Sequence, residues 1–242
     1  MDISILYEDG YLLAIDKPSG VVVNRSENVS SQTIQDWAED KLNIKNQDTR
    51  NNKSNFYDRA GIVHRLDKET SGILLIAKDK ITFLNLQDQF KNRTVKKSYF
   101  VLVHGNIAIR KMTIKVPVGR LPWNKRKFGV LPYGRNAETR ILVRHHYEDD
   151  KANRYSLIEA IPVTGRTHQI RIHLKHFGFP VVADYLYSGR KVYREAIKFC
   201  PRLFLHAYRL QFNHPETSES KSIEKELPLE LNQVLEKLKL VD

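Results

Sequence analysis

One acidic residue, Asp67, stands where a folded chain could expose a reactive carboxylate. It lies in the stretch His64-Arg65-Leu66-Asp67-Lys68-Glu69-Thr70-Ser71-Gly72, and the apolar run 73–77 follows directly. This run is short and rich in branched residues, which predicts a buried strand preceded by a turn at Ser71-Gly72. A side chain in such a tight connection faces the cleft at a strand end. The same stretch also fits a plain hydrogen-bonded turn with no chemical role.

Metal chemistry is a poor match for these residues. Metal-dependent phosphodiester cleavage normally uses several clustered carboxylates, and near Asp67 the sequence offers only Glu69. His168 and His173 are five residues apart, whereas two histidines of a helical metal site stand four apart. The sequence has 1 cysteine, Cys200, which excludes a zinc site built from cysteines. We therefore expect no metal, and we interpret these histidines and His64 as structural.

Charge points to a polyanionic partner. The 242 residues carry a formal net charge of +12, and 41% of them are hydrophobic, as in a folded protein. Residues 119–144 hold 7 basic residues and 1 acidic residue, whereas residues 216–242 hold 7 acidic and 4 basic ones. Such segregation favours a binding face for nucleic acid over a merely solubilising surface.

No run approaches about 18 apolar residues, so no membrane span is expected. The N-terminus has neither the basic start nor the apolar centre of a signal peptide. A single cysteine is compatible with a reducing compartment. We therefore expect a cytoplasmic protein that does not bind membranes, and we expect it to be a monomer.

The first half of the chain predicts strands and two helices. Strands are expected at 3–7, 11–15 and 21–23, around turns at Asp9-Gly10 and 17–20. Apolar spacing predicts a helix over 31–44, capped by Ser30 or Ser31. Residues 45–56 are polar and predict a surface loop, and Asp79 is expected to cap a helix that ends near Arg93.

The second half predicts more strands than helices. Strands are expected at 97–103, 112–118, 139–147, 155–163 and 203–212, and a terminal helix over 229–240. Another helix is expected just after Arg166, with Ile170, His173, Leu174 and Phe177 on one face and a stop at Gly178. Residues 119–137 predict an irregular basic loop with Trp123, Phe128 and Tyr133 among its cations. Many strands without regular βα alternation predict an α+β fold with a mostly antiparallel sheet. We expect one domain over 1–242, or two subdomains that share one sheet.

Several of these patches together resemble RluA-type RNA pseudouridine synthases. The stretch 64–72 is similar to the catalytic signature of that family, and Lys17-Pro18-Ser19-Gly20 to its opening motif. Lys97-Ser98-Tyr99 resembles its tyrosine-bearing strand. The segment 165–173, with Gly178-Phe179-Pro180 and Asp184, resembles its third motif, and Leu205-His206-Ala207 its final strand. The motifs follow the family order from about Leu6 to Pro215.

The resemblance implies isomerisation of uridine to pseudouridine in rRNA or tRNA, without a cofactor. It also implies a pseudouridine synthase fold, in which flanking helices cover a mixed sheet with a central active-site cleft. The chain departs from the family at Asp16, where Asn is usual, and at Ala60, where Pro is common. Many relatives carry an N-terminal S4 RNA-binding domain, which we expect to be absent because the chain starts at the core.

The resemblance assigns three catalytic residues. Asp67 would act as nucleophile at C1′ or as base at C2′ of a uridine that has left its stack. Arg166 would keep that carboxylate ionised and oriented, since a neighbouring guanidinium opposes the pKa rise that burial causes. Tyr99 would stack on the uracil and help to remove the C5 proton. The plain alternatives are a phosphate-binding or surface arginine for Arg166 and a core tyrosine for Tyr99.

Five basic residues are candidates for RNA contact. Arg65 would fill the space that the extruded base leaves, unless it forms a structural ion pair. The others are Lys125, Arg126, Lys127 and Arg171, three of them in the basic loop, where aromatic residues could stack on bases. The loop also fits a hairpin tip with only solvating charge. A non-catalytic RNA-binding factor is the rival interpretation, but it would not need Asp67, Tyr99 and Arg166 together.

Overall fold

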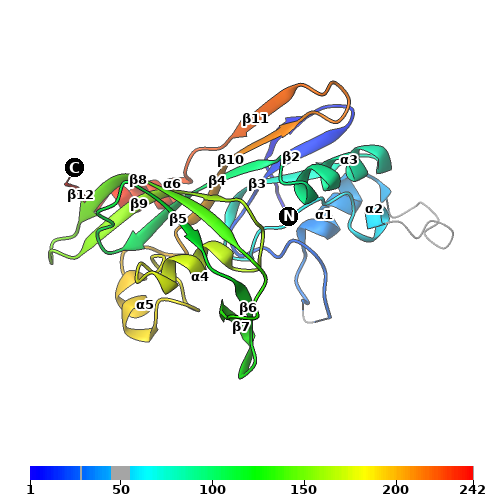
Figure 1. Cartoon of the computed structure of the whole chain (residues 1–242). Helices are drawn as coiled ribbons and strands as arrows, with labels where there is room; N and C mark the ends of the chain where they lie inside the picture. The colour runs from blue at the N-terminus through cyan, green and yellow to red at the C-terminus, as the bar shows by residue number, and fades with distance from the viewer. Residues whose placement is uncertain (28, 45–54, 242) are drawn as a thin grey trace. The chain divides into compact units, whose positions relative to one another are not determined.

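The computed structural model describes residues 1–27, 29–44 and 55–241, with the backbone alone at Lys125 and Arg126 (Figure 1). The chain forms two compact units. Unit 1 comprises Met1–Lys96 and Arg209–Lys225, and unit 2 comprises Lys97–Tyr208 and Glu226–Asp242. Within the described residues, no helix has the length and apolar character needed to cross a membrane.

Unit 1 is built around a fully buried strand. In strand order it holds β1 (Ile5–Glu8), β2 (Leu12–Lys17), β3 (Ser71–Ala77) and the second half of β10 (Leu205–Asn213), with β11 (Ser220–Glu224) also paired to β10. The β1–β2, β2–β3 and β10–β11 pairs are antiparallel. Every residue of β3 is buried, which explains why its sequence is a continuous apolar run rather than an alternating one. The strand predicted at 21–23 is absent, and β11 was not predicted.

Three helices accompany these strands. The predicted helix 31–44 is observed as α1 (Ile34–Lys41), but Thr33 caps it, not Ser30 or Ser31. Thr33 and Asp36 form a reciprocal capping box, a pattern that the sequence contains and that is specific to such caps. The prediction for Asp79 is confirmed, because its Oδ1 accepts from the Thr82 amide, 2.9 Å away, at the start of α3 (Lys80–Lys91).

The predicted loop 45–56 is only partly within the described residues. Residues 45–54 lie outside them, and residues 55 and 56 belong to the short helix α2 (Asn55–Asp58). Phe56 is buried because its ring packs edge-on against Phe83 of α3, with the ring centroids 5.8 Å apart. One aromatic residue, Phe56, thus anchors the end of a segment whose polar composition predicted a surface loop.

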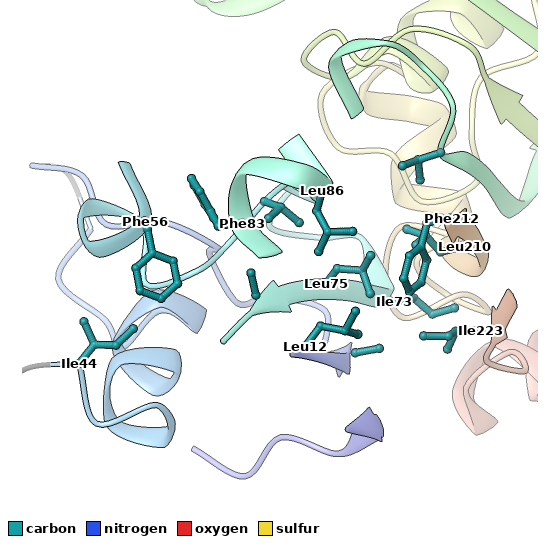
Figure 2. Close-up of a cluster of buried hydrophobic side chains, with 14 residues drawn as sticks. Leu12, Ile44, Phe56, Ile73, Leu75, Phe83, Leu86, Leu210, Phe212 and Ile223 are labelled. Atoms are coloured by element: carbon teal, nitrogen blue, oxygen red, sulfur yellow. The ribbon is translucent and has the colours of Figure 1, made fainter. Parts of the chain in front are cut away.

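The core of unit 1 lies between its strands and helices (Figure 2). Leu12 of β2 and Leu75 of β3 contribute from the sheet, Phe83 and Leu86 from α3, and Phe212 from β10. These side chains are nearly or fully buried. The strand that follows the Asp67 stretch is therefore fixed on both faces by packing.

Unit 2 contains the longer strands. Their order is β10 in its first half, β4 (Lys96–His104), β9 (Arg154–Pro162), β8 (Glu138–Glu148) and β12 (Lys239–Leu240), with β5 (Lys111–Lys115) also paired to β8. β4 and β9 run antiparallel, with Tyr99 opposite Ala160. The predicted strands at 97–103, 139–147 and 155–163 are confirmed, and so is the α+β class.

The predicted irregular loop 119–137 is largely a β-hairpin. β6 (Val118–Leu121) and β7 (Asn124–Val130) pair as a separate two-stranded sheet, which projects below α4 (Gln169–His176) in Figure 1. Two further helices, α5 (Arg190–Ala196) and α6 (Leu229–Glu236), complete the unit. The terminal helix is shorter than predicted, because residues 239–240 leave it to form β12. α5 and β12 were not predicted.

Candidate active site

Asp67 lies in a tight turn at the start of β3. The Thr70 amide donates to the Asp67 carbonyl at 3.1 Å, which closes the turn. Leu66, before it, is 5% exposed and Thr70, after it, is 2% exposed, whereas Asp67 itself is half-buried. The backbone on both sides is thus anchored in unit 1, while Asp67 itself keeps partial access to solvent.

A second turn, residues 17–21, is hydrogen-bonded to the Asp67 turn, and we call these bonds the clamp. The ammonium of Lys17 is fully buried and donates to the carbonyls of Pro18 at 2.7 Å, Val21 at 2.8 Å and Lys68 at 3.2 Å. The Gly20 amide also donates to the Lys68 carbonyl, at 2.8 Å. Bonds from a buried charged group are stronger than neutral ones, and breaking them is costly. The backbone beside Asp67 is therefore fixed by residues about fifty positions upstream.

His64 and Arg65 occupy different environments just before this turn. The Leu75 amide donates to His64 Nε2 at 3.0 Å, and the His64 ring stacks on Phe90 at 4.6 Å between centroids. His64 thus has a structural contact with β3 and α3, as expected. Arg65 is exposed, so its guanidinium can be reached from solvent.

The other two predicted catalytic residues belong to unit 2. Tyr99 is a residue of β4 and is 9% exposed. Arg166 precedes α4, and its Nε donates to the Asn136 carbonyl at 3.2 Å. The loop of Arg166 lies close to the start of β4. A Cβ atom added to Gly165, the residue before Arg166, would be 3.7 Å from Lys97 Nζ. Burial lowers the pKa of Lys97. The structure therefore brings Tyr99 and Arg166 into one unit, while Asp67 and Arg65 belong to the other.

Gln169 fixes the loop that carries Arg166. Its side-chain oxygen accepts from the Arg166 amide at 3.1 Å and from the Thr164 hydroxyl at 2.6 Å. Its amide nitrogen donates to the Glu138 carbonyl at 3.0 Å and to the Thr139 hydroxyl at 2.9 Å. One buried glutamine thus ties the loop to β8. The sequence motif contained Gln169, but nothing in its residue type indicated this role.

Arg171 is not placed to touch RNA as predicted. It is 2% exposed, and its Nε and Nη2 each lie 2.8 Å from a carboxylate oxygen of Asp184, which is fully buried. This bidentate geometry is the strongest that an arginine and a carboxylate can form. Asp184 also accepts from the amides of Leu186 and Tyr187 at 3.0 and 3.1 Å. Arg171 therefore organises the segment after α4 from inside unit 2.

That segment connects to the loop of Arg166 and to the hairpin. The Tyr187 hydroxyl lies 2.8 Å from His168 Nδ1 and accepts from the Phe128 amide at 3.3 Å. His168 has φ +55°, a left-handed conformation that is unusual for a residue other than glycine. Phe128 packs in a small core with Tyr187 and Ile172, so it is a structural residue rather than an exposed stacking platform.

The hairpin presents its aromatic and basic residues unevenly. Trp123 is 76% exposed and Tyr133 is 71% exposed, whereas Lys127 Nζ donates to the Leu186 carbonyl at 2.9 Å. The side chains of Lys125 and Arg126 lie outside the described part of the structure. RNA contact by Lys125, Arg126 and Lys127 thus stays a prediction, and within the described residues the exposed rings of Trp123 and Tyr133 are compatible with it.

Burial lowers the pKa of two further histidines. His173 is fully buried, its Nε2 lies 3.1 Å from the Val116 carbonyl, and burial lowers its pKa. Burial also lowers the pKa of His104 to about 4. Across the described residues, no group of three or more His, Cys, Asp or Glu side chains is arranged to hold a metal ion.

Known RNA pseudouridine synthases are similar to this chain along almost its entire length. A family profile described as RNA pseudouridylate synthase matches residues 11–176. An uncharacterized RNA pseudouridine synthase of Bacillus subtilis, YlyB, is 36% identical over 239 residues, which are 99% of this chain and 74% of that protein. The ribosomal large subunit pseudouridine synthase C of Pasteurella multocida is 35% identical over 234 residues, 96% of this chain and 66% of that protein.

A solved structure agrees with these matches. The human protein RNA Pseudouridylate Synthase Domain Containing 1 superposes with a TM-score of 0.74 and 26% identity, and the match covers 99% of this chain and 89% of that one. The chain spans about two thirds to three quarters of the length of the two bacterial relatives.

Proposed function

Because the chain belongs to the RNA pseudouridylate synthase family, we propose that Asp67 is the carboxylate that starts its reaction. The chain is an RNA pseudouridine synthase, an isomerase that converts uridine to pseudouridine within RNA. The N1–C1′ bond breaks, the uracil turns over and a C5–C1′ bond forms. The C5 proton then leaves and N1 gains one, so that the product is an isomer of the substrate.

The observation that carries this proposal is the clamp on the Asp67 turn. A carboxylate that attacks C1′, or removes a proton from C2′, has to meet a flipped-out uridine in one orientation. The Lys17 ammonium and the Gly20 amide both bond the Lys68 carbonyl, next to Asp67. Asp67 is only half-buried, so the fixed turn leaves this residue partly accessible to a substrate.

Arg166 and Tyr99 are proposed to complete the site. A guanidinium beside Asp67 would favour the ionised carboxylate and fix its orientation. The Gln169 bonds support this role, because they hold the Arg166 backbone in one conformation. The largely buried Tyr99 ring offers a face to the uracil, and its phenol could help to remove the C5 proton. Arg65 would fill the space left in the RNA stack.

Ribosomal RNA of the large subunit is the proposed substrate, with tRNA as the alternative. The Pasteurella multocida relative is named for the ribosomal large subunit. A net charge of +12 suits a large polyanion, and the exposed Trp123 and Tyr133 suit unpaired bases. We also propose that the protein acts as a monomer in the cytoplasm, where such RNA is modified.

The test compares the wild type with Asp67→Asn and Glu69→Gln on ribosomal and transfer RNA from cells that lack the protein. Pseudouridine is mapped chemically, and RNA binding is measured separately. Asp67→Asn should abolish modification and retain binding. Glu69→Gln is the matched control, because it removes an exposed carboxylate two residues away and should retain modification. Pseudouridine that still forms with Asp67→Asn would reject the assignment of Asp67.

A further inference from the structure

A second cationic surface lies on α5, outside the predicted site. Arg190, Lys191 and Arg194 are exposed on this short helix. Arg190 and Arg194 stand four residues apart, so their like charges lie on one face and repel each other. Within the described residues none of the three forms an ion pair, although Glu195 of the same helix, which pairs with Lys198 at 2.7 Å, also attracts Lys191 at longer range. Repulsion of this kind is expected where an anionic partner binds.

Two tyrosines adjoin these cations. Tyr185 is 74% exposed, and its ring meets Tyr193 of α5 edge-on, with centroids 5.3 Å apart and an interplanar angle of 75°. Tyr193 is one residue before Arg194 and three after Arg190, so the ring pair borders the cationic face. Packing does not account for Tyr185, since most of its ring faces solvent. Exposed rings beside cations match the needs of an unpaired base and its phosphates.

Buried residues next to Tyr185 and at the end of α5 hold this surface in place. Tyr185 stands between Asp184, held by the buried Arg171, and Leu186, whose amide donates to Asp184. Ala196 at the end of α5 is fully buried and packs in one core with Phe204. The tyrosine and the helix are therefore presented on a fixed base, which lowers the entropic cost of binding.

The same segment also contacts the hairpin. Lys127 Nζ donates to the Leu186 carbonyl at 2.9 Å, and the Phe128 amide donates to the Tyr187 hydroxyl at 3.3 Å. Figure 1 shows α5 and the β6–β7 hairpin on the same side of unit 2. The α5 surface and the exposed Trp123 at the hairpin turn thus belong to one connected part of the unit.

We propose that the α5 surface, formed by Tyr185, Arg190, Lys191, Tyr193 and Arg194, binds an unpaired segment of the substrate RNA. The proposal rests on the RNA activity proposed above and adds a contact outside the three catalytic residues. The arginines and the lysine bind phosphates, and the Tyr185 ring stacks on a base. The uridine to be modified is then selected partly by single-stranded RNA at a distance from it.

The first test removes the charges. Arg190, Lys191 and Arg194 are changed together to Ala, and affinity for a stem-loop RNA with a single-stranded flank is measured against salt concentration. The control changes Lys80, Lys91 and Lys96, which are also exposed, to Ala and removes the same net charge. The α5 variant should reduce the slope of log Kd against log salt by about 2, at about 0.7 per lost phosphate contact. The control should change it much less, and equal slopes for the two variants would overturn the proposal.

The second test examines stacking. Tyr185→Leu should weaken binding of the flanked stem-loop about tenfold or more, whereas Tyr185→Phe, which keeps the ring, should bind like the wild type. Neither change should alter binding of a fully paired RNA. Equal affinity of the Leu and Phe variants would overturn the stacking role. Loss of binding to anionic phospholipid vesicles, with RNA binding unchanged, would assign the surface to a membrane instead.

All of these affinities are measured with Asp67→Asn as the parent protein and in the wild type. Binding does not require pseudouridine formation, so an effect of the α5 variants is visible whether or not Asp67 is catalytic. If Asp67→Asn remains active while the α5 variants lose affinity, the catalytic assignment fails and the binding surface stands. The reverse result rejects the surface alone.

Discussion

The buried ammonium of Lys17 donates to the backbone carbonyl of Lys68, 3.2 Å away, and Lys68 directly follows Asp67. The same ammonium bonds two carbonyls of its own turn, those of Pro18 and Val21. A residue far upstream in the sequence thus sets the backbone conformation next to the proposed catalytic carboxylate. A lysine is suited to this because the three protons of its ammonium can reach three acceptors at once.

Lys17→Met should therefore lower both the free energy of unfolding and the rate of turnover. Methionine fills similar volume but leaves the three carbonyls without their charged donor, at an expected cost of about 3 kcal/mol in the free energy of unfolding. Urea denaturation measures this cost, and single-turnover assays measure the rate. The matched control is Lys68→Met, because Lys68 contributes only its backbone carbonyl and its side chain is exposed. A Lys17 variant that is as stable as the Lys68 variant would contradict the clamp.

Gln169→Leu should slow the reaction without a comparable loss of RNA affinity. The change removes the acceptor of the Arg166 amide and the donor to the Glu138 carbonyl, so the loop of Arg166 gains freedom. We expect kcat to fall at least about tenfold, since small displacements of a positioning group are costly in rate. Arg166→Lys should show the same pattern more strongly. If Gln169→Leu changes RNA affinity and leaves kcat intact, Gln169 does not act through Arg166.

The Arg171–Asp184 pair should behave as a structural unit. Arg171→Met leaves a buried carboxylate uncompensated, which costs about 3–5 kcal/mol in the free energy of unfolding. Asp184→Asn added to it should recover part of that loss, because a neutral amide needs no counter-charge. A double-mutant cycle by chemical denaturation gives the coupling energy, expected at about 1–3 kcal/mol. Fully additive losses would mean that the two residues are not coupled.

The same variant tests whether Arg171 contacts RNA. With a guanidinium that is 2% exposed, Arg171→Met should leave the salt dependence of RNA binding unchanged in the folded protein. The measurement is made at a temperature where the variant is folded, as judged by circular dichroism. A slope reduced as for a lost phosphate contact would restore the RNA role that the sequence indicated.

The sequence predicted the elements whose signals are local. β3 was predictable because a short, continuous run of branched apolar residues is typical of a buried strand, and the Asp79 cap because the side chain and the Thr82 amide are three residues apart. The terminal helix was predicted too long, since β12 depends on pairing with Glu148 and Tyr147 far away in sequence. The segment 119–137 was predicted to be an irregular loop because its many basic residues are not typical of strands. Its sequence therefore did not indicate that β6 pairs with β7.

The roles of charged residues were harder to predict than their positions. Arg171 and Arg166 are both arginines near α4, yet one is buried against Asp184 and the other bonds the Asn136 carbonyl. Their partners differ because the 181–188 segment folds back so that Asp184 meets Arg171. No local sequence pattern predicts this long-range contact. The burial of Lys17 was not predicted, because a lysine is almost never fully buried and its carbonyl acceptors include Lys68, far away in sequence.

Glu159 should make stability depend on acid pH. Burial alone would raise its pKa, but hydrogen bonds from Tyr208, Ser98 and Arg144 outweigh burial and hold the pKa below its usual value of 4.5. The unfolded chain therefore binds a proton at a higher pH than the folded protein does. The stabilisation is present above about pH 4.5 and is lost as the pH falls through the lowered folded-state pKa.

Glu159→Gln tests this dependence. The variant should be about 1–3 kcal/mol less stable at neutral pH, because Arg144 loses its negative partner. It should also lose less stability than the wild type between about pH 6 and about pH 3. Urea denaturation at each pH gives both quantities. Glu236→Gln, an exposed carboxylate on α6, is the control and should follow the wild-type curve. If the Glu159 and Glu236 variants show the same pH dependence, Glu159 is not the group whose protonation destabilises the fold.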